Sequence, residues 1–236
     1  MFQIRQVESN QTDVHPRLSE VVRRHLQHAY RRPPAEHTRE AFARLDPPAG
    51  VPWLLDGGCG NGESSVRLAQ AFPEAWVLGV DRSAARLEQG QRLHEPLPPN
   101  LCLLRADLVD LVLMARDAGW RCATLYLLYP NPWPKAEHLQ RRWHGHAVFP
   151  LLLQLADQLE LRSNWELYLQ EFALALELTG RPRPEIESWQ PQQPVSAFER
   201  KYLLAGQPLY RLRSDLNDKE QIAKADLQNT RDRQVS

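Results

Sequence analysis

The sequence predicts an α/β fold with a mostly parallel, twisted sheet that carries helices on both faces. From residue 51 onward, short apolar runs alternate with segments of helical periodicity, which is the order of strands and crossover helices in a parallel sheet. The apolar runs are continuous, as expected for strands that are covered on both faces. A glycine-rich stretch directly follows the first run, where folds of this class place a ligand-binding loop.

Residues 1–50 precede this alternation and are expected to form an arm with two helices that pack on the main domain. "RLSEVVRRHLQHAY" has helical spacing and stops at "RRPP", and "AEHTREAFARLD" is helical until "PPAG" ends it. The arm contains several arginines with few acidic neighbours. This pattern fits either a basic arm or solvated helix faces, and both interpretations stay open.

Residues 51–213 contain the alternating elements and form the predicted main domain. The sequence predicts strands at residues 51–55, 75–81, 101–107, 123–130, 159–164 and 208–213. It predicts helices at residues 63–72, 82–94, 108–119, 145–159 and 165–180, the last with Gly180 as its C-cap. Residues 214–236 are polar and mixed in charge, so they are expected to form a disordered tail.

Composition narrows the class of protein. The chain has 29 Lys and Arg against 29 Asp and Glu, so it has no strong overall field to attract nucleic acid. No apolar run has the roughly 18 residues that a membrane helix needs, and the N-terminus lacks a signal pattern, so we expect a cytoplasmic protein. The three cysteines lie in or beside apolar runs without CxxC spacing, which predicts reduced thiols and no metal site.

The stretch "LLDGGCGNGE" is a glycine-rich loop between the first expected strand and its helix. Glycines allow a tight turn and let a ligand approach the backbone closely. No GK[ST] sequence follows, and the acid that begins the loop would repel a pyrophosphate. A cationic cofactor without phosphates tolerates that acid, and S-adenosylmethionine fits this description.

Three aspartates end the first three expected strands: Asp56, Asp81 and Asp107. In an open α/β sheet such side chains project into the crevice at the carboxyl edge, where ligands bind. An acid after the second strand suits ribose hydroxyls, and Asp107 suits the exocyclic amine of an adenine. The alternative is that these residues cap helices, as Asp often does at such junctions.

A proline-rich corner, "YPNPWPK", follows the fourth expected strand. Pro130, Pro132 and Pro134 fix φ and remove N–H donors, so Asn131 is expected to be held on a stiff corner at the sheet edge. Basic residues follow it directly. They fit phosphate contacts or a solvated helix face.

The order of these features resembles that of the tRNA (guanine-N7)-methyltransferase family, which has a class I methyltransferase Rossmann-like fold. "LDGGCGNGES" resembles the family's cofactor loop, and "YPNPWPK" resembles the start of its PDPWxKxRHxKRR motif. "SNWELY" resembles its T-D-W-x-x-Y segment, and "SAFERKY" resembles its T-x-F-E-R motif. The resemblance covers roughly residues 50–213.

This resemblance implies transfer of a methyl group from S-adenosylmethionine to N7 of a guanine in tRNA, by a monomer without metal. The catalytic residue would be Asn131, which would face both cofactor and guanine. The implied cofactor-binding residues are Asp56, Gly58, Gly60, Asn61, Asp81, Asp107 and Asn131. The implied substrate-binding residues are Lys135, Asn164, Ser196, Phe198 and Glu199. The residues expected to contact phosphates are Lys135, His138, Arg141 and Arg142.

The chain departs from the family pattern at four positions. Asn131 and Asn164 replace aspartates, Glu137 replaces an arginine and Ser196 replaces a threonine. An amide offers guanine one acceptor and one donor where a carboxylate offers acceptors only. Two alternatives therefore stay open: a divergent methyltransferase with another acceptor, and a non-catalytic RNA-binding subunit that retains the cofactor fold.

Overall fold

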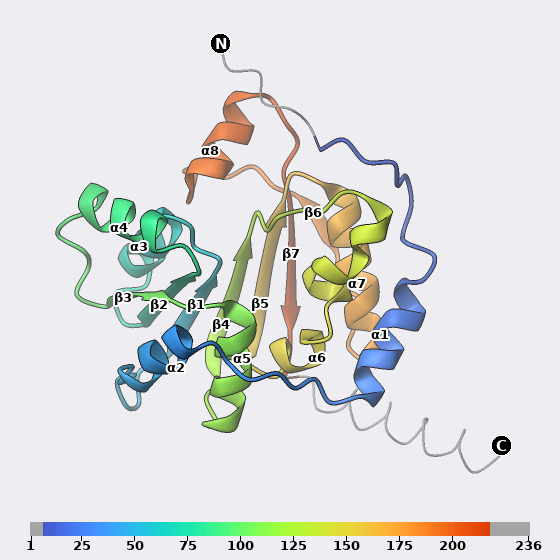
Figure 1. Cartoon of the computed structure of the whole chain (residues 1–236). Helices are drawn as coiled ribbons and strands as arrows, with labels where there is room; N and C mark the ends of the chain where they lie inside the picture. Colours follow the sequence, from blue (N-terminus) through green and yellow to red (C-terminus); the bar gives the residue numbers. More distant parts are fainter. Residues whose placement is uncertain (1–6, 218–236) are drawn as a thin grey trace.

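The structure is a computed structural model that describes residues 7–217 of the chain. In these residues, one sheet of seven strands has the order β3-β2-β1-β4-β5-β7-β6. Strands β1 to β5 pair in parallel, and β7 runs antiparallel to both β5 and β6. The α/β fold with a mostly parallel sheet is thus confirmed (Figure 1).

The strands are β1 Trp53–Gly57, β2 Trp76–Asp81, β3 Leu101–Arg105, β4 Cys122–Leu128, β5 Ala156–Ser163, β6 Ile186–Ser188 and β7 Tyr210–Asp215. The α-helices are α1 Leu18–Gln27, α2 Glu36–Ala43, α3 Glu63–Ala71, α4 Ala84–Leu93, α5 Leu108–Asp117, α6 Phe149–Leu152, α7 Glu166–Leu178 and α8 Ala197–Leu204. Two 3₁₀ helices, η1 Ala136–Arg141 and η2 Trp143–Gly145, follow the proline corner.

Alternating residues of the central strands face two separate cores. Leu55 and Leu78 belong to the main hydrophobic cluster, which also contains buried residues of α1, α5, α6 and α7. Their neighbours Leu54 and Val77 belong to a smaller cluster with Leu68 of α3. Helices therefore cover both faces of the sheet, as the uninterrupted apolar strands predict. Helices α3 and α4 lie at one end of the sheet and α1 and α7 at the other (Figure 1).

The prediction of a helix at residues 145–159 is wrong for most of that segment. Only η2 and the short α6 form there, and β5 already begins at Ala156. Strand β5 pairs with β4 on one side and β7 on the other, so two ladders of hydrogen bonds outweigh the local helical pattern. Strand β7 also extends to Asp215, two residues into the predicted tail. Residues 218–236 of that tail lie outside the described residues.

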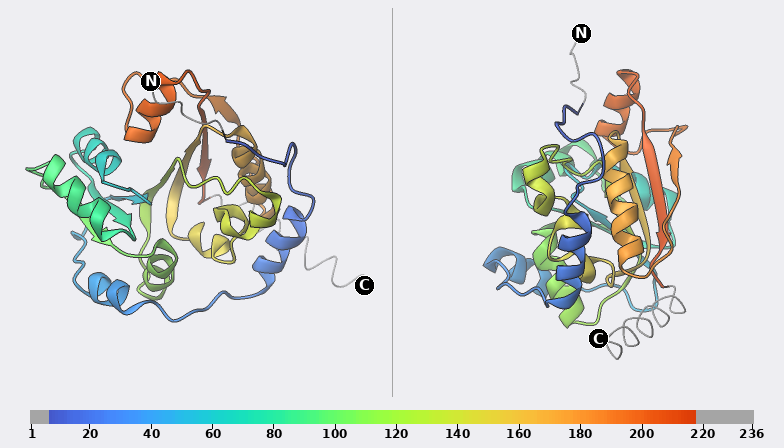
Figure 2. Two further views of the ribbon diagram at one scale, coloured as in Figure 1. Left: turned by 45° about the horizontal axis from the view of Figure 1, so that its top comes forward. Right: turned by 90° about the vertical axis from the view of Figure 1, so that its right-hand side faces the viewer.

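One strand and one α-helix were not predicted. Strand β6 adds a short outer edge, and α8 forms within a segment that was expected to be a loop before the last strand. Helix α8 begins with a capping interaction in which the hydroxyl of Ser196 accepts a 3.1 Å hydrogen bond from the backbone N–H of Glu199. The S-x-x-E spacing of a capping box was the available signal. Helix α8 lies at the carboxyl edge of the parallel strands (Figures 1 and 2).

The N-terminal arm wraps the domain. Residues 7–17 descend from the carboxyl edge along the side of α7, and α1 then packs on α7 and η2 (Figure 1). Leu18, Val21 and Val22 of α1 are buried in the main core, because their spacing places them on one helix face. Helix α2 contacts α5 and β3. None of the helices between residues 7 and 217 is long and apolar enough to cross a bilayer.

Candidate active site

The glycine loop after β1 borders open space at the carboxyl edge of the sheet. Gly58 and Gly60 have φ values of +85° and +62°, which side chains other than glycine rarely adopt. A Cβ atom on either residue would meet nothing within 4 Å, so the backbone faces an open volume. The loop therefore offers a ligand the close approach to its backbone that the sequence predicted.

The loop is also fixed by the close packing of α4. A Cβ atom on Gly90 would lie 1.7 Å from the carbonyl oxygen of Asn61, so only glycine allows α4 to approach the loop this closely. The side chain of Asn61 accepts a 3.3 Å hydrogen bond from the N–H of Glu63, at the start of α3. Asn61 therefore orders the turn into α3, which keeps the loop in place.

Asp56 lies beneath the loop and not in the crevice. Only 1% of its surface is exposed, and its Oδ2 accepts hydrogen bonds from the hydroxyls of Ser64 and Ser65 at 2.5 and 2.7 Å. Burial raises the pKa of Asp56, and the two serine hydrogen bonds oppose the rise. The direct cofactor contact predicted for Asp56 is not supported, because the carboxylate is buried and joins β1 to α3.

Asp81 organises the loop from the next strand. Its Oδ2 accepts a 3.0 Å hydrogen bond from the N–H of Gly60, and its Oδ1 accepts one of 2.8 Å from the N–H of Ser83. Arg86 pairs with the same carboxylate at 3.3 Å. Asp81 is 5% exposed and holds two loops in register, and its contact with the cofactor stays a prediction.

Asp107 caps a helix, which is one of the two interpretations that the sequence left open, and its contact with the cofactor stays a prediction. Its Oδ1 caps α5 by accepting a 2.9 Å hydrogen bond from the N–H of Val109. The carboxylate stays half-exposed and pairs at 3.0 Å with Arg32 from the N-terminal arm. Arg32 also pairs with the buried Asp110, so at least this arginine of the arm is engaged within the protein.

The proline corner is strained at two positions. Tyr129 and Trp133 have φ values of +53° and +45°, which are costly for bulky residues and occur mostly where surrounding contacts enforce them. Between them, Asn131 is exposed, and its Oδ1 accepts a 3.2 Å hydrogen bond from the N–H of Trp133. The corner thus presents the side chain of Asn131 outward at the carboxyl edge.

A buried carboxylate holds the first end of the corner. Glu199 of α8 is 0% exposed, and its Oε1 accepts hydrogen bonds from the Tyr129 hydroxyl at 2.7 Å and from Trp189 Nε1 at 3.0 Å. Arg162 pairs with the same oxygen at 3.0 Å, and the N–H of Val195 donates to Oε2 at 2.7 Å. Glu199 was predicted to bind substrate, but its carboxylate is enclosed and serves to fasten α8 to the corner.

A buried arginine holds the other end. Arg142 is 0% exposed, and its Nε and Nη2 donate to the carbonyl oxygens of Trp133 and Lys135 at 3.1 and 3.3 Å. Its Nη1 pairs with Glu171 of α7 at 2.5 Å. The phosphate contact predicted for Arg142 is therefore wrong, because this guanidinium is enclosed and its donors bind groups within the protein.

The buried Glu171 receives further donors. Burial opposes its charge, but the hydrogen bond from His144 and the charge of Arg142 lower the pKa of Glu171 to about 2. Burial lowers the pKa of His144, so its ring is neutral and donates from Nε2 to Glu171 at 2.9 Å. The ionised carboxylate of Glu171 on α7 thus binds Arg142, and Arg142 in turn binds two carbonyl oxygens of the corner.

The other predicted phosphate contacts differ in exposure. Lys135 and Arg141 are exposed, and Arg141 lies over the ring of Trp133 at 4.8 Å from its centre. His138 is half-buried with its ring against the edge of Trp133 at 5.5 Å. Lys135 and Arg141 thus remain available to a phosphate backbone, whereas His138 mainly packs the corner.

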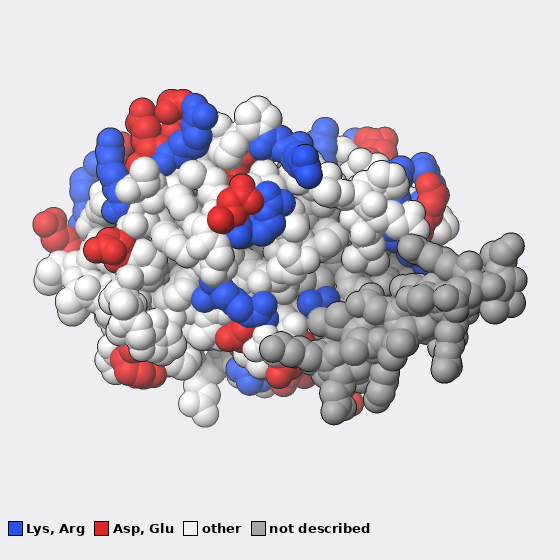
Figure 3. Space-filling view, turned by 90° about the horizontal axis from the view of Figure 1, so that it is seen from below, with Lys and Arg blue, Asp and Glu red and all other residues white. Residues whose placement is uncertain are grey.

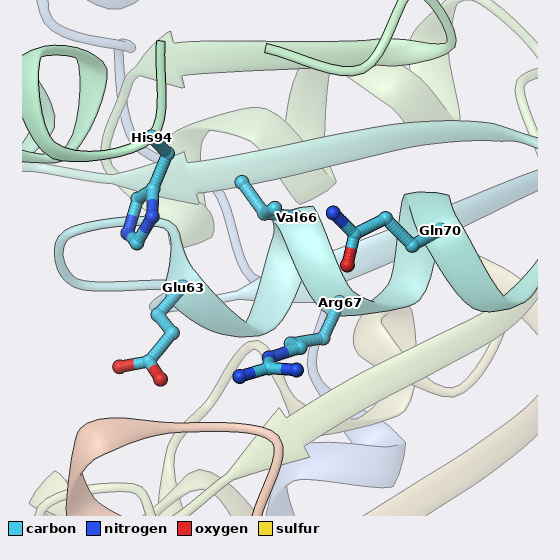
Figure 4. Close-up of a pocket in the computed structure, with 5 residues that line it drawn as sticks. All are labelled: Glu63, Val66, Arg67, Gln70 and His94. Carbon is cyan, nitrogen blue, oxygen red and sulfur yellow. The ribbon is translucent and has the colours of Figure 1, made fainter. Parts of the chain in front are cut away.

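Two pockets lie near these elements. One, of about 380 Å³, is lined by Asn164, Trp165 and Gln170 at the start of α7 and by Val7 and Thr12 of the arm. The other, of about 260 Å³, is lined along α3 by Glu63, Val66, Arg67 and Gln70, with His94 opposite (Figure 4). No predicted site residue lines the second pocket, whereas Asn164 places the first beside the predicted substrate site.

The chain is similar in sequence to known methyltransferases. A family described as "Putative methyltransferase" matches residues 51–212. A tRNA (guanine-N(7)-)-methyltransferase of Halorhodospira halophila is 33% identical over 180 residues, which are 70% of this chain and 77% of that protein. One of Leifsonia xyli is 31% identical over 69% of this chain and 75% of that protein. The chain belongs to the tRNA (guanine-N7)-methyltransferase family.

Solved structures support the fold independently. An antibiotic-related methyltransferase is 14% identical with a TM-score of 0.52, covering 78% of this chain and 96% of its own. A 16S rRNA (adenine(1408)-N(1))-methyltransferase of Catenulisporales acidiphilia, solved with S-adenosylmethionine, is 20% identical with a TM-score of 0.52, covering 80% and 94%. Both show the class I methyltransferase fold that the sequence predicted for this tRNA (guanine-N7)-methyltransferase family member.

The remaining residues predicted from the family motifs surround the corner. Asn164 is half-buried and donates from Nδ2 to Gln207 Oε1 at 2.9 Å. Ser196 caps α8, and Phe198 is 54% exposed on the same helix. Phe198 stacks on Tyr202, which in turn lies 5.6 Å from the ring of Tyr129. Phe198 therefore presents an aromatic face at the carboxyl edge.

Sequence reasoning missed Gln11, Glu171 and Tyr129. Glu171 interrupts the apolar run "LYLQEFALALEL", and a charge on the buried side of a helix requires a partner, so this signal was present. Nothing local identifies Gln11 as part of the site, because the two side chains that it joins, Glu171 and Arg142, are distant in sequence. Between residues 7 and 217, the structure brings together no group of three His, Cys, Asp or Glu side chains suited to a metal ion.

Proposed function

We propose that this chain transfers the methyl group of S-adenosylmethionine to N7 of a guanine in tRNA. The observation that carries the proposal is the corner itself. A strained segment, fastened at both ends by buried ion pairs, presents Asn131 and Lys135 at the carboxyl edge in a member of this family. Such stored strain is typical of sites where a side chain must be positioned for a ligand.

The glycine loop and the neighbouring acids fit the cofactor. Gly58 and Gly60 leave room for a ligand against the backbone, and Asp81, which ends the second strand beside this loop, would bind the ribose hydroxyls. The half-exposed Asp107 would face the adenine. When bound, S-adenosylmethionine supplies an electrophilic methyl group on a sulfonium that becomes a neutral thioether.

The reaction requires alignment more than acid–base chemistry. Guanine N7 has an in-plane lone pair and no proton, so it forms the new N–C bond while the S–C bond breaks. The positive charge passes from sulfur to the guanine ring, and no proton moves. The protein's contribution is to hold nucleophile and methyl group in line and to exclude water, which the rigid corner with Asn131 favours.

The guanine site would lie between Asn131 and the pocket at the start of α7. The pocket of about 380 Å³ has room for a purine base, and Asn164 lines it. Phe198 offers a face on which an extruded base stacks. Lys135 and Arg141 would contact phosphates and fix the register of the RNA.

The substrate RNA would approach this carboxyl edge and not the opposite side of the molecule. On the part of the opposite face that the structure describes, basic and acidic residues are interspersed (Figure 3). Such a surface gives no extended positive field. A tRNA substrate also implies a cytoplasmic location, which forms part of this proposal.

The two amides favour one second candidate, a methyltransferase with another acceptor. Asn131 and Asn164 stand where the family pattern has carboxylates, which accept from N1–H and N2–H₂ of guanine. Asn164 also donates one of its amide hydrogens to Gln207 within the protein. A single acceptor still suits guanine, but it discriminates less strongly against other bases.

A transfer assay with radiolabelled S-adenosylmethionine tests the proposal. Total tRNA, ribosomal RNA and cellular protein are offered separately, and the proposal expects label in tRNA that is released by reduction and aniline cleavage at 7-methylguanine. The Lys135→Ala variant is the matched comparison and should label tRNA more weakly. Label in another RNA or in protein would favour the second candidate, and no label in any fraction would favour a binding subunit.

A further inference from the structure

We propose that residues 9–15, here called the N-terminal strap, belong to the active site and position the proline corner, with Gln11 as the central positioning residue. This inference rests on the proposed function, because it assigns a role in the same reaction. The strap lies outside residues 51–212, which the family comparison matches. The main domain of residues 51–213 would then need its arm for catalysis.

The strap contacts the corner directly. The hydroxyl of Ser9 donates a 2.6 Å hydrogen bond to the carbonyl oxygen of Pro134. The N–H of Ala136 donates to Asn10 Oδ1 at 3.4 Å, just beyond Lys135. These contacts join segments more than 120 residues apart, so the folded arm, and not local sequence, holds the end of the corner.

Gln11 links the two buried charges behind the corner. Its Nε2 donates to Glu171 Oε1 at 2.5 Å, and its Oε1 accepts from Arg142 Nη2 at 3.1 Å. The backbone N–H of His15 donates to the same Glu171 oxygen at 2.9 Å. The carboxamide of Gln carries N–H donors and an acceptor oxygen at its tip, so it satisfies a carboxylate and a guanidinium at once.

Arg142 transmits this arrangement to the site. Its guanidinium has no exposed surface and divides its donors among Gln11, Glu171 and the carbonyl oxygens of Trp133 and Lys135. Removal of Gln11 leaves Nη2 with the carbonyl of Lys135 as its remaining partner among these groups. A buried guanidinium that loses an acceptor shifts or admits water, and the two carbonyls that it holds move with it.

The strap also forms part of the pocket wall. Thr12 directly follows Gln11 in the sequence and lines the pocket that contains Asn164. One short segment therefore contacts both the corner that presents Asn131 and the pocket proposed for the base. This shared position explains why a shift of the strap would disturb catalysis more than cofactor binding, since the glycine loop is held by other residues.

Three variants test the role of Gln11. Gln11→Ala removes both contacts, and Gln11→Glu keeps the acceptor for Arg142 but places a carboxylate against Glu171. We expect each to lower kcat for RNA methylation about 10-fold or more, while KM for S-adenosylmethionine stays within about twofold. The double variant Gln11→Glu with Glu171→Gln should not recover the rate, because an amide at residue 171 offers one acceptor oxygen where the carboxylate accepts from Arg142, His144 and the N–H of His15. Glu8→Ala, at an exposed position just before the strap, is the matched control.

Hydrogen exchange gives a readout that does not depend on activity. In Gln11→Ala, backbone amides of residues 131–137 should exchange faster than in the wild type and in Glu8→Ala, while those of β1 and β4 are unchanged. If the corner amides exchange equally fast in Gln11→Ala and the wild type, or if exchange rises uniformly across the sheet, the positioning role is overturned, whatever the methylation rates are. Unchanged kcat in an active protein would overturn it as well. Should the wild type transfer no methyl group to RNA, the proposed function fails, and exchange alone decides on the strap.

Discussion

The hydroxyl of Tyr129 at the end of β4 donates a 2.7 Å hydrogen bond to the buried carboxylate of Glu199 on α8. The bond joins residues 70 positions apart and holds Tyr129 at its positive φ. Burial raises the pKa of the tyrosine, so the hydroxyl remains a donor at all ordinary pH values. Together with Arg142 at the other end, this contact makes the corner a rigid unit.

Removal of the Glu199 carboxylate should destabilise the protein strongly. Glu199→Ala leaves Arg162 without its partner on α8 and removes the acceptor of Tyr129, so we expect a loss of about 3–5 kcal/mol in the free energy of unfolding. Urea unfolding followed by fluorescence measures it. Glu185→Ala, at an exposed position, is the control with a change below about 0.5 kcal/mol. A loss below about 1 kcal/mol for Glu199→Ala would contradict the clamp.

Replacement of Asn131 by aspartate should increase methylation of guanine. A carboxylate at this position provides acceptors only, and charge-assisted hydrogen bonds are roughly twice as strong as neutral ones. Single-turnover transfer to tRNA measures the change, with Asn131→Ala as the comparison that lowers the rate. A slower Asn131→Asp enzyme would instead show that the amide is adapted to a different acceptor.

Gly90 should tolerate no side chain. In Gly90→Ala the new Cβ would lie 1.7 Å from the Asn61 carbonyl oxygen, so α4 or the glycine loop must move. We expect weaker binding of S-adenosylmethionine by about 10-fold or more in calorimetry. Gly119→Ala is the control, since Gly119 has a positive φ but open space around it. That variant should lose about 1 kcal/mol of stability and bind normally.

Stability should fall as the pH drops below about 6.5. Burial lowers the pKa of His144 below its usual value of 6.5, so the unfolded chain takes up a proton that the folded protein resists. The contribution of His144 is complete above pH 6.5 and declines below it, by up to about 1.4 kcal/mol per pH unit. The pKa of Glu171 is also lowered, from 4.5 to about 2, so its contribution is lost only below about pH 4.5.

Unfolding in urea at pH 7.5, 6.5 and 5.5 measures this dependence. His144→Gln keeps a donor for Glu171 but does not titrate, so its stability should change less between pH 6.5 and 5.5 than that of the wild type. Identical slopes for the two proteins would show that His144 does not bind the proton on unfolding.

Sequence patterns predicted the central part of the fold because those patterns are local. Strands β1 to β4 and helices α3 to α5 appear close to their expected bounds, since both periodicity and turn residues are confined to a few positions. The glycine loop, Asp81 and the corner lie at one edge, as their order along a parallel sheet requires. Strand β5 was misplaced because its pairing with two other strands, and not its own pattern, decides its length.

Spacing in the sequence thus determined the parallel sheet and the residues of the corner, and the resemblance of the motifs indicated the family. Only the tertiary structure decided which charges are enclosed. The sequence predicted that Arg142 contacts phosphates and that Glu199 binds substrate, yet both are buried with partners from distant segments. The physical reason is that a charge leaves water only where the fold supplies its complete set of partners, and Gln11 meets Glu171 across 160 residues of chain.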